Sequence, residues 1–300
     1  MIFQLSYTKM SSAARCPRYY YYDRELGIES ESKKLGMKFG SAGHAGLNTL
    51  YMTKDLGKCL EAATTAWIPF EGQDENKDGK AGVRTLTKLK EILTAYHEQF
   101  FVGEDWTDAG GEKLEEVYIY VPYDIQQKML VVSGNLYTDI RYLVKVDRKG
   151  LSGDVPAIQE FKFLKPIMGS DFVPEPNNQI VGYLKASKCK KAIVTVAKVQ
   201  VSSVKGMVKG KLKSDEPHSI FTRDPVFYEE HVFKEFEQDA IGWTLSILTW
   251  KASNYWPKAA PDACNDFGGC QFRNLCAVSP EQRRVLLDLG FKKKKPYEKT

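Results

Sequence analysis

The chain contains the stretch Ala157-Ile158-Gln159-Glu160-Phe161-Lys162-Phe163, an apolar run of strand type that carries one carboxylate and one lysine. Successive side chains of a strand point to opposite faces, so Glu160 and Lys162 are expected on the same face. An acid and an amine side by side can hold a divalent metal and a water next to a phosphate. Charges also alternate on many solvated strands, and that alternative stays open for this stretch taken alone.

Length and charge limit the class of protein. The chain has 300 residues, 43% of them apolar, and a net charge of +5. This length suits one elaborate domain or two modest ones, and the mild positive charge permits a nucleic-acid partner without requiring one. The N-terminus lacks the features of a signal peptide, and the longest nearly uncharged stretch, 240–250, is too short to span a bilayer. We therefore expect a soluble, cytoplasmic protein with no membrane partner.

The spacing of apolar residues predicts helices, then a run of strands, then helices again. Helices are predicted over 36–52, 83–100, 178–188 and 229–253. Strands are predicted over 117–121, 129–133, 136–146, 158–163 and 192–201. The expected fold class is α/β, with a small central mixed β-sheet flanked by helices.

The cysteines are unevenly distributed. Cys16 stands near the start, whereas Cys264, Cys270 and Cys276 cluster near the end. A reducing cytosol disfavours disulfides, so this cluster indicates a metal or an iron–sulfur centre. Zn²⁺ bound with Cys16 or a histidine is the alternative. The remaining two, Cys59 and Cys189, are expected to be ordinary thiols.

A second carboxylate lies upstream, where Asp139 stands at the head of a predicted strand. If that strand pairs beside the Glu160 strand, the two carboxylates meet across neighbouring strands. With Lys162 they would form a phosphodiesterase centre in which the carboxylates hold Mg²⁺ or Mn²⁺ and the lysine acts on the attacking water. Asp147 and Asp154 are the fallback ligands.

Together these motifs resemble a known family. An Asp followed by Glu-x-Lys on the next strand is similar to the signature of PD-(D/E)XK nucleases. Residues 39–44, Phe-Gly-Ser-Ala-Gly-His, resemble the Gly-x-x-x-His motif of its RecB-like branch, and residues 179–183 resemble the Gln-x-x-x-Tyr motif. The cysteines resemble those of iron–sulfur members, which include the AddB nuclease, the CRISPR adaptation exonucleases and phage RecB-like exonucleases. One departure is the spacing from Cys264 to Cys270, which is longer than those members have.

The resemblance implies a restriction-endonuclease-like core over residues 1–280, with a basic tail over 281–300. Segments 6–22 and 257–278 would bind the cluster and so join the N- and C-terminal parts. The implied activity is that of a metal-dependent DNA exonuclease on single-stranded or end-containing DNA, in a bacterial or phage-infected cell. Recombination, phage or CRISPR adaptation proteins would be its partners. The alternative is a non-catalytic DNA-binding module with the same fold and cluster.

The resemblance also implies roles for individual residues. The implied metal ligands are His44, Asp139, Glu160 and the carbonyl of Phe161. The implied catalytic residues are Asp139, Glu160, Lys162, Gln179 and Tyr183. A [4Fe-4S] cluster, with Zn²⁺ as the alternative, would be held by Cys16, Cys264, Cys270 and Cys276.

Three residues are expected to contact DNA, namely Arg18, Lys165 and Tyr183. The basic segment 205–213 is a further candidate for phosphate contacts. Four consecutive tyrosines, 19–22, could place their rings in the core and their hydroxyl groups in water. We favour this role over stacking on single-stranded bases.

Overall fold

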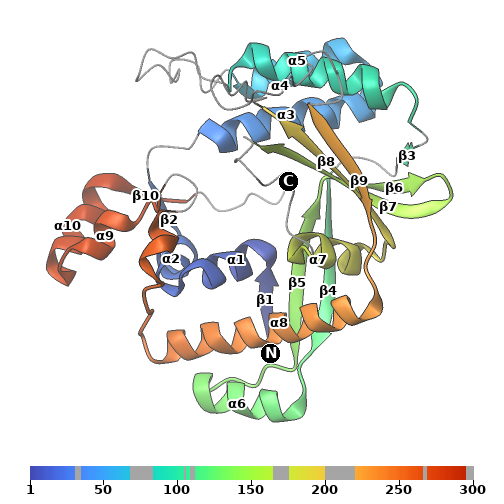
Figure 1. The fold of residues 1–300 in the computed structure, drawn as a ribbon. Helices are drawn as coiled ribbons and strands as arrows, with labels where there is room; N and C mark the ends of the chain where they lie inside the picture. Colours follow the sequence, from blue (N-terminus) through green and yellow to red (C-terminus); the bar gives the residue numbers. More distant parts are fainter. Residues whose placement is uncertain are drawn as a thin grey trace, which may run out of the picture. The chain divides into compact units, whose positions relative to one another are not determined.

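The structure is a computed structural model that describes residues 1–30, 35–67, 84–104, 106–108, 112–164, 176–199, 220–265 and 269–294. The chain divides into two compact units. Unit 1 comprises residues 1–33, 116–144 and 230–300, and unit 2 comprises residues 34–115 and 145–229. Figure 1 shows the helices and strands of both units.

Unit 2 contains a mixed sheet with the strand order β3-β6-β7-β8-β9. Its strands are β3 (Trp106–Asp108), β6 (Arg148–Ser152), β7 (Val155–Leu164), β8 (Lys191–Lys198) and β9 (Phe221–Val226). β7 and β8 run parallel, and the other described pairs are antiparallel. A parallel pair needs a crossover connection, which contains α7 (Asn178–Ser187). The predicted mixed α/β fold is thus confirmed.

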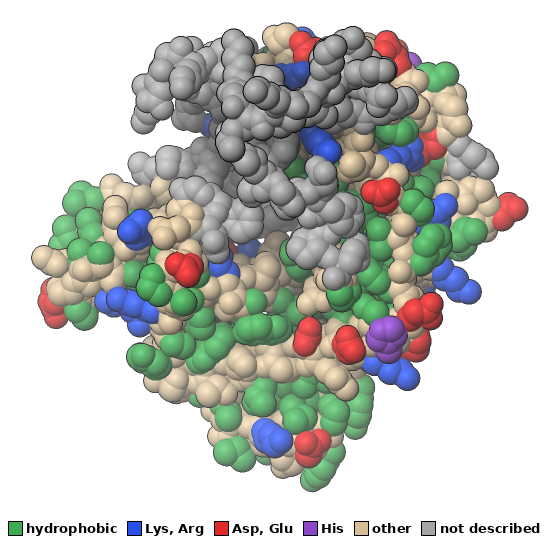
Figure 2. All heavy atoms as spheres, in the orientation of Figure 1, with side chains coloured by type: hydrophobic (Ala, Val, Ile, Leu, Met, Phe, Trp, Pro, Cys, Tyr) green, Lys and Arg blue, Asp and Glu red, His purple; other side chains and the backbone are tan. Residues whose placement is uncertain are grey.

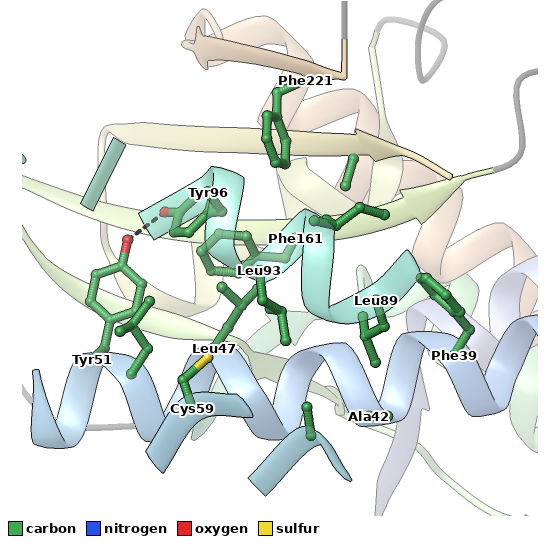
Figure 3. Packing of buried hydrophobic residues seen from close by; sticks show 14 of the residues in the cluster. Phe39, Ala42, Leu47, Tyr51, Cys59, Leu89, Leu93, Tyr96, Phe161 and Phe221 are labelled. Carbon is green, nitrogen blue, oxygen red and sulfur yellow. Dashed lines mark hydrogen bonds between the residues drawn. The ribbon is translucent and has the colours of Figure 1, made fainter. Parts of the chain in front are cut away.

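Three helices of unit 2 pack against one face of this sheet. They are α3 (Leu35–Thr53), α4 (Leu56–Trp67) and α5 (Leu86–Tyr96), which continues as a π-helical turn over His97–Phe101. Their apolar side chains form one core with Ala157 and Phe161 of β7, as Figure 3 shows for Phe161. The alternation of β7 therefore leaves Glu160 and Lys162 for the opposite face.

A second sheet, most of which belongs to unit 1, has the strand order β1-β5-β4. Its strands are β1 (Ile2–Ser6), β5 (Asp139–Val146) and β4 (Lys113–Tyr120). The predicted long helix is α8 (Glu230–Ala252), whose Phe236 ring lies 5.0 Å from that of Tyr142. No helix among the described residues is both long and apolar enough to cross a membrane.

The run of tyrosines belongs to the core of unit 1. It follows α1 (Tyr7–Arg15) and spans α2 (Pro17–Tyr20) and a π-helical turn over Tyr21–Glu25. The Tyr20 ring stacks on Trp256 at 5.7 Å, and the Tyr22 ring lies 5.2 Å from Phe272. Both tyrosines are buried. The favoured prediction of a core role is therefore confirmed for these two.

The strand predicted over 129–133 is wrong, because these residues end a helix, α6 (Tyr123–Ser133). Gly134 follows with φ of 71°, a left-handed conformation that ends helices and favours glycine. Met129 is buried while Val131 is 86% exposed, so the apolar run straddles the two sides of a helix. Figure 2 shows hydrophobic side chains exposed where Figure 1 draws α6.

Residues 281–294 form secondary structure where the sequence predicts a tail. They follow α9 (Arg273–Ala277) and form most of α10 (Pro280–Gly290) and then β10 (Phe291–Lys293), which pairs with β2 (Ile28–Ser30). The Phe291 ring stacks on Phe272 at 5.7 Å, and Lys294 forms an ion pair with Asp23. Partial burial of Phe291 and this ion pair explain why the segment folds back. Residues 295–300 lie outside the described part.

Candidate active site

Glu160 and Lys162 lie on one face of β7, as the alternation predicts. Lys162 Nζ donates a hydrogen bond to Glu160 Oε1. It donates a second one, of 2.9 Å, to Oε1 of Gln179. Glu160 is only 3% exposed, whereas the Lys162 side chain keeps a quarter of its surface exposed. The amine therefore lies between a buried carboxylate and solvent.

Helix α7 supplies Gln179 and Tyr183 to the same place. Asn177 caps the helix, because its side chain accepts hydrogen bonds from the amides of Gln179 and Ile180. Gln179 Nε2 donates to the Tyr183 hydroxyl at 2.7 Å and to Glu160 Oε1 at 3.3 Å. Positions four apart share a helix face, so the cap and the spacing together direct both side chains toward β7.

Asp147 is the second carboxylate at this site. It is the first residue after β5, and its Oδ2 accepts a hydrogen bond of 2.9 Å from the amide of Phe161. The N–H and C=O of one strand residue point to the same edge, so the Phe161 carbonyl also points toward the edge where Asp147 lies. The β6–β7 pairing ends at Arg148 and Gln159, which leaves this edge of Phe161 without a described partner strand.

His44 reaches the same place from α3. Its Nδ1 lies 3.4 Å from Asp147 Oδ1, and its ring lies 5.8 Å from that of Phe163. Burial lowers the pKa of the imidazole, which favours the neutral form that binds metals. A Cβ on Gly43 would lie 2.3 Å from Phe163 Cζ, whereas a Cβ on Gly40 would meet open space. Gly43 is therefore the glycine that lets α3 approach β7 beside His44.

The two carboxyl groups are buried next to each other. Burial, and after it the charge of Asp147, raise the pKa of Glu160 to about 7. Burial also raises the pKa of Asp147 to about 6. Lys162 opposes both shifts, but one lysine does not neutralise two buried carboxylates. The charge balance of the site therefore favours binding of a cation.

One oxygen atom indicates where a cation would bind. Glu160 Oε2 is buried and accepts no hydrogen bond within the described part of the chain. A buried oxygen without a partner calls for an explanation, and a bound ion is one. The other groups here that could hold a cation are the His44 nitrogen, the Asp147 carboxylate and the Phe161 carbonyl, and donors of these types suit Mg²⁺ or Mn²⁺. These side chains are not arranged as a ready metal site, since the described residues include no group of three His, Cys, Asp or Glu that could hold an ion.

The strand pairing predicted for Asp139 is wrong. β7 lies between β6 and β8, whereas Asp139 begins β5, which pairs with β1 in the other sheet. Its Oδ2 accepts a hydrogen bond of 2.8 Å from the Thr138 hydroxyl. The fallback residue Asp147 lies beside Phe161 instead. The other fallback, Asp154, lies exposed in the turn between β6 and β7.

Of the predicted DNA contacts, Tyr183 lies at the site and Arg18 lies in unit 1. The Arg18 guanidinium donates a hydrogen bond of 2.9 Å to the Trp256 carbonyl. Lys165 and the segment 205–213 lie outside the described residues.

The four cysteines of the predicted cluster lie in unit 1 near one another. Cys16 precedes α2, Cys264 ends a 3₁₀ helix (Pro261–Cys264), and Cys276 lies in α9. Burial raises the pKa of the Cys270 and Cys276 thiols, and Cys16 raises both further. The Cys270 amide donates to the Cys264 carbonyl at 2.8 Å. All four are free thiols, and they too form no ready metal group among the described residues.

Comparison with known families supports part of the resemblance. A family model described as the PD-(D/E)XK nuclease superfamily matches residues 4–135. Similarity to that superfamily is thus confirmed for this segment, which includes Cys16 and His44 but ends before Asp147. None of the curated proteins matches the sequence.

Two solved structures are similar to the chain at low identity. A candidate exonuclease from Eubacterium rectale is 10% identical, with a TM-score of 0.47, over 87% of this chain and 86% of its own. The protein SSO0001 is 12% identical, with a TM-score of 0.33, over 80% of this chain and 75% of its own.

Proposed function

We propose that the protein is a metal-dependent deoxyribonuclease that hydrolyses phosphodiester bonds. The observation that carries this proposal is the buried Glu160, whose Oε2 accepts no hydrogen bond among the described residues while Asp147, His44 and Lys162 surround it. A buried carboxylate pair beside an amine combines a cation site with a group that can act on a water.

The cation is Mg²⁺ or Mn²⁺. Its ligands are His44, Asp147, Glu160 and the carbonyl of Phe161, and Asp147 takes the role that the sequence suggests for Asp139. Bound there, the ion would lower the pKa of a water and neutralise charge that develops on the phosphate. The neutral imidazole favours Mn²⁺ somewhat more than a purely oxygen shell would.

Lys162 orients the attacking water and stabilises negative charge on the phosphate. Its Nζ is held between Glu160 and Gln179, so the amine has a defined position before substrate binds. Gln179 fixes Lys162 through Oε1 and Tyr183 through Nε2. Tyr183, held by Gln179, contacts a phosphate or sugar of the substrate. Preorganised donors of this kind lower the barrier because they need no rearrangement during the reaction.

The substrate is DNA, and the mode of cleavage is exonucleolytic on single-stranded or end-containing DNA. Similarity of residues 4–135 to the PD-(D/E)XK nuclease superfamily supports a DNA-cleaving hydrolase. Arg18 and Lys165 contact phosphates, and recombination, phage or CRISPR adaptation proteins in the cytoplasm of the host cell are its partners.

A [4Fe-4S] cluster joins the N- and C-terminal segments through Cys16, Cys264, Cys270 and Cys276. The proximity of the four thiols supports this role, and the positive charges of Arg15, Arg18 and Lys258 partly oppose the burial that raises the pKa of Cys270 and Cys276. Zn²⁺ at the same cysteines is the alternative.

The test is degradation of end-labelled single-stranded DNA by anaerobically purified protein, with Mn²⁺, with Mg²⁺ and without divalent metal. Linear and circular DNA distinguish exonuclease from endonuclease cleavage. Metal-dependent loss of linear DNA is expected. DNA binding without cleavage under every condition would instead support the non-catalytic DNA-binding module.

A further inference from the structure

A buried polar network lies in the core of unit 2, on the side of β7 opposite Glu160. Glu104 is its centre. Oε2 of Glu104 accepts a hydrogen bond of 2.5 Å from the Tyr51 hydroxyl, and Oε1 accepts one of 2.7 Å from Gln159 Nε2. Arg223 forms an ion pair with the same carboxylate. We call these residues, together with Tyr96 and Arg148, the Glu104 network.

The network is surrounded by apolar side chains. Figure 3 shows Tyr51 and Tyr96 among the labelled residues of the core, with their hydroxyls joined by a hydrogen bond, which measures 2.5 Å. Gln159 is only 1% exposed. Polar groups buried in this way cost free energy unless they are paired, and an apolar core of the same shape is often at least as stable. Stability alone therefore does not account for the network.

Arg148 attaches the strand next to β7 to this network. Its guanidinium carbon lies 3.7 Å from the centroid of the Tyr51 ring, and the residue is 2% exposed. A cation over an aromatic face is attracted most strongly where water is excluded. Arg148 is also paired with Gln159 in the β6–β7 register. The network thus contacts both β6 and β7 at the residue pair Arg148 and Gln159.

Two of the proposed cation ligands have a chain neighbour in the network, and the third lies on the helix that carries Tyr51. Arg148 directly follows Asp147, and Gln159 directly precedes Glu160. Tyr51 follows His44 by seven positions in α3, which is two helical turns and therefore the same side of the helix. Adjacent strand residues point to opposite faces, so Gln159 can belong to the network while Glu160 belongs to the cation site.

We propose that the Glu104 network positions the cation ligands His44, Asp147 and Glu160. This inference rests on the proposed function. Glu104, Tyr51, Gln159 and Arg148 are positioning residues, because they act through the backbone of the ligands and do not touch the cation or the substrate. Loss of the network would let the three ligands spread apart, which weakens cation binding before it affects any other step.

The test compares two network variants with a matched control. Tyr51→Phe removes one hydroxyl and keeps the ring under Arg148, and Glu104→Gln removes the central charge. Tyr142→Phe, in unit 1, removes a hydroxyl from a tyrosine that is equally buried but lies outside the network. Calorimetric titration with Mn²⁺ gives the dissociation constant of each folded protein, and thermal unfolding gives its Tm.

We expect the Mn²⁺ dissociation constant to rise about tenfold in Tyr51→Phe and Glu104→Gln, the range seen when supporting partners of metal ligands are removed. Tyr142→Phe should bind Mn²⁺ like the wild type. Cleavage by Tyr51→Phe should recover at saturating Mn²⁺, because the defect lies in cation binding. A merely structural residue would lower the Tm without this recovery.

Unchanged Mn²⁺ affinity in Tyr51→Phe would overturn the inference and leave the proposed function intact, whatever happens to the Tm. This milder variant decides the matter if Glu104→Gln does not fold. A wild-type protein that binds no Mn²⁺ would overturn both the inference and the proposed function.

Discussion

The amide of Phe161 donates a hydrogen bond of 2.9 Å to Asp147 Oδ2. This contact fixes a carboxylate from the end of one strand to the backbone of the strand that carries Glu160. The two carboxyl groups are thereby held together out of water, and the pKa of each is raised. A cation relieves that charge, so the metal site and the local fold depend on the same contact.

The contact predicts that Asp147→Asn loses function while the fold is kept. The Asn oxygen can still accept from the Phe161 amide, but the variant lacks the charge that a divalent cation needs. Cleavage should fall by more than about 100-fold. The Mn²⁺ dissociation constant should rise by at least the factor of about ten that is expected when a supporting partner of a ligand is lost. Asp139→Asn is the matched control and should cleave like the wild type. If Asp139→Asn lost cleavage and Asp147→Asn kept it, the ligand would be Asp139.

Lys162→Met should separate cation binding from catalysis. The variant removes the amine beside Glu160 and preserves the length of the side chain. We expect cleavage to fall about 1,000-fold because the water and the developing charge lose their partner. Mn²⁺ affinity should be retained or increased, since a positive charge next to the site has been removed. Retained cleavage would end the assignment of Lys162 as a catalytic residue.

The raised pKa values predict how the stability of the protein without divalent metal depends on pH. A carboxyl whose pKa is raised by folding stabilises the fold below its unfolded pKa, and this contribution is lost as the pH rises through the folded value. For Glu160 this stabilisation is lost between the ordinary pKa range of a glutamate and about pH 7. The Tm should therefore fall between pH 5 and pH 8 more steeply in the wild type than in Glu160→Gln.

Added Mn²⁺ should reverse this loss at pH 8, where both carboxylates are ionised and able to bind it. The apparent affinity for Mn²⁺ should accordingly increase from pH 5.5 to pH 8. Parallel Tm profiles for the wild type and Glu160→Gln would argue against a buried, titrating Glu160.

The cysteine cluster predicts a brown protein after anaerobic purification. Cys270→Ser should lose the colour and lower the Tm by about 10 °C, because a cross-link over so long a loop stabilises by about 4 kcal/mol. Cys59→Ala is the control, since its thiol is fully buried and burial raises its pKa to about 12. A colourless wild type with one bound zinc would show that the cysteines hold Zn²⁺ and not an iron–sulfur cluster.

Local patterns predicted much of the candidate site. The alternation in β7 correctly placed Glu160 and Lys162 on one face, and the spacing of Gln179 and Tyr183 correctly placed them on one helix face. Both inferences depend only on neighbours within a single element. Strand pairing is not local, and for that reason the partner predicted for the Glu160 strand was wrong.

Asp147 illustrates what local sequence patterns cannot predict. It is a turn residue after a strand, and no periodicity connects it to Phe161, fourteen positions later. The Glu104 network was equally hidden, since its members come from α3, α5, β6, β7 and β9 and the turns beside them. Similarly, the helix α6 was mistaken for a strand because a short apolar run has no clear period, and its end is set by Gly134.

The most direct test of the account is the anomalous scattering of a crystal grown with Mn²⁺. The account predicts one strong peak within about 2–2.5 Å of oxygen atoms of Asp147 and Glu160, with a His44 nitrogen as a further ligand. A peak bound by Asp139 in place of Asp147, or the lack of any peak beside Glu160 Oε2, would contradict it.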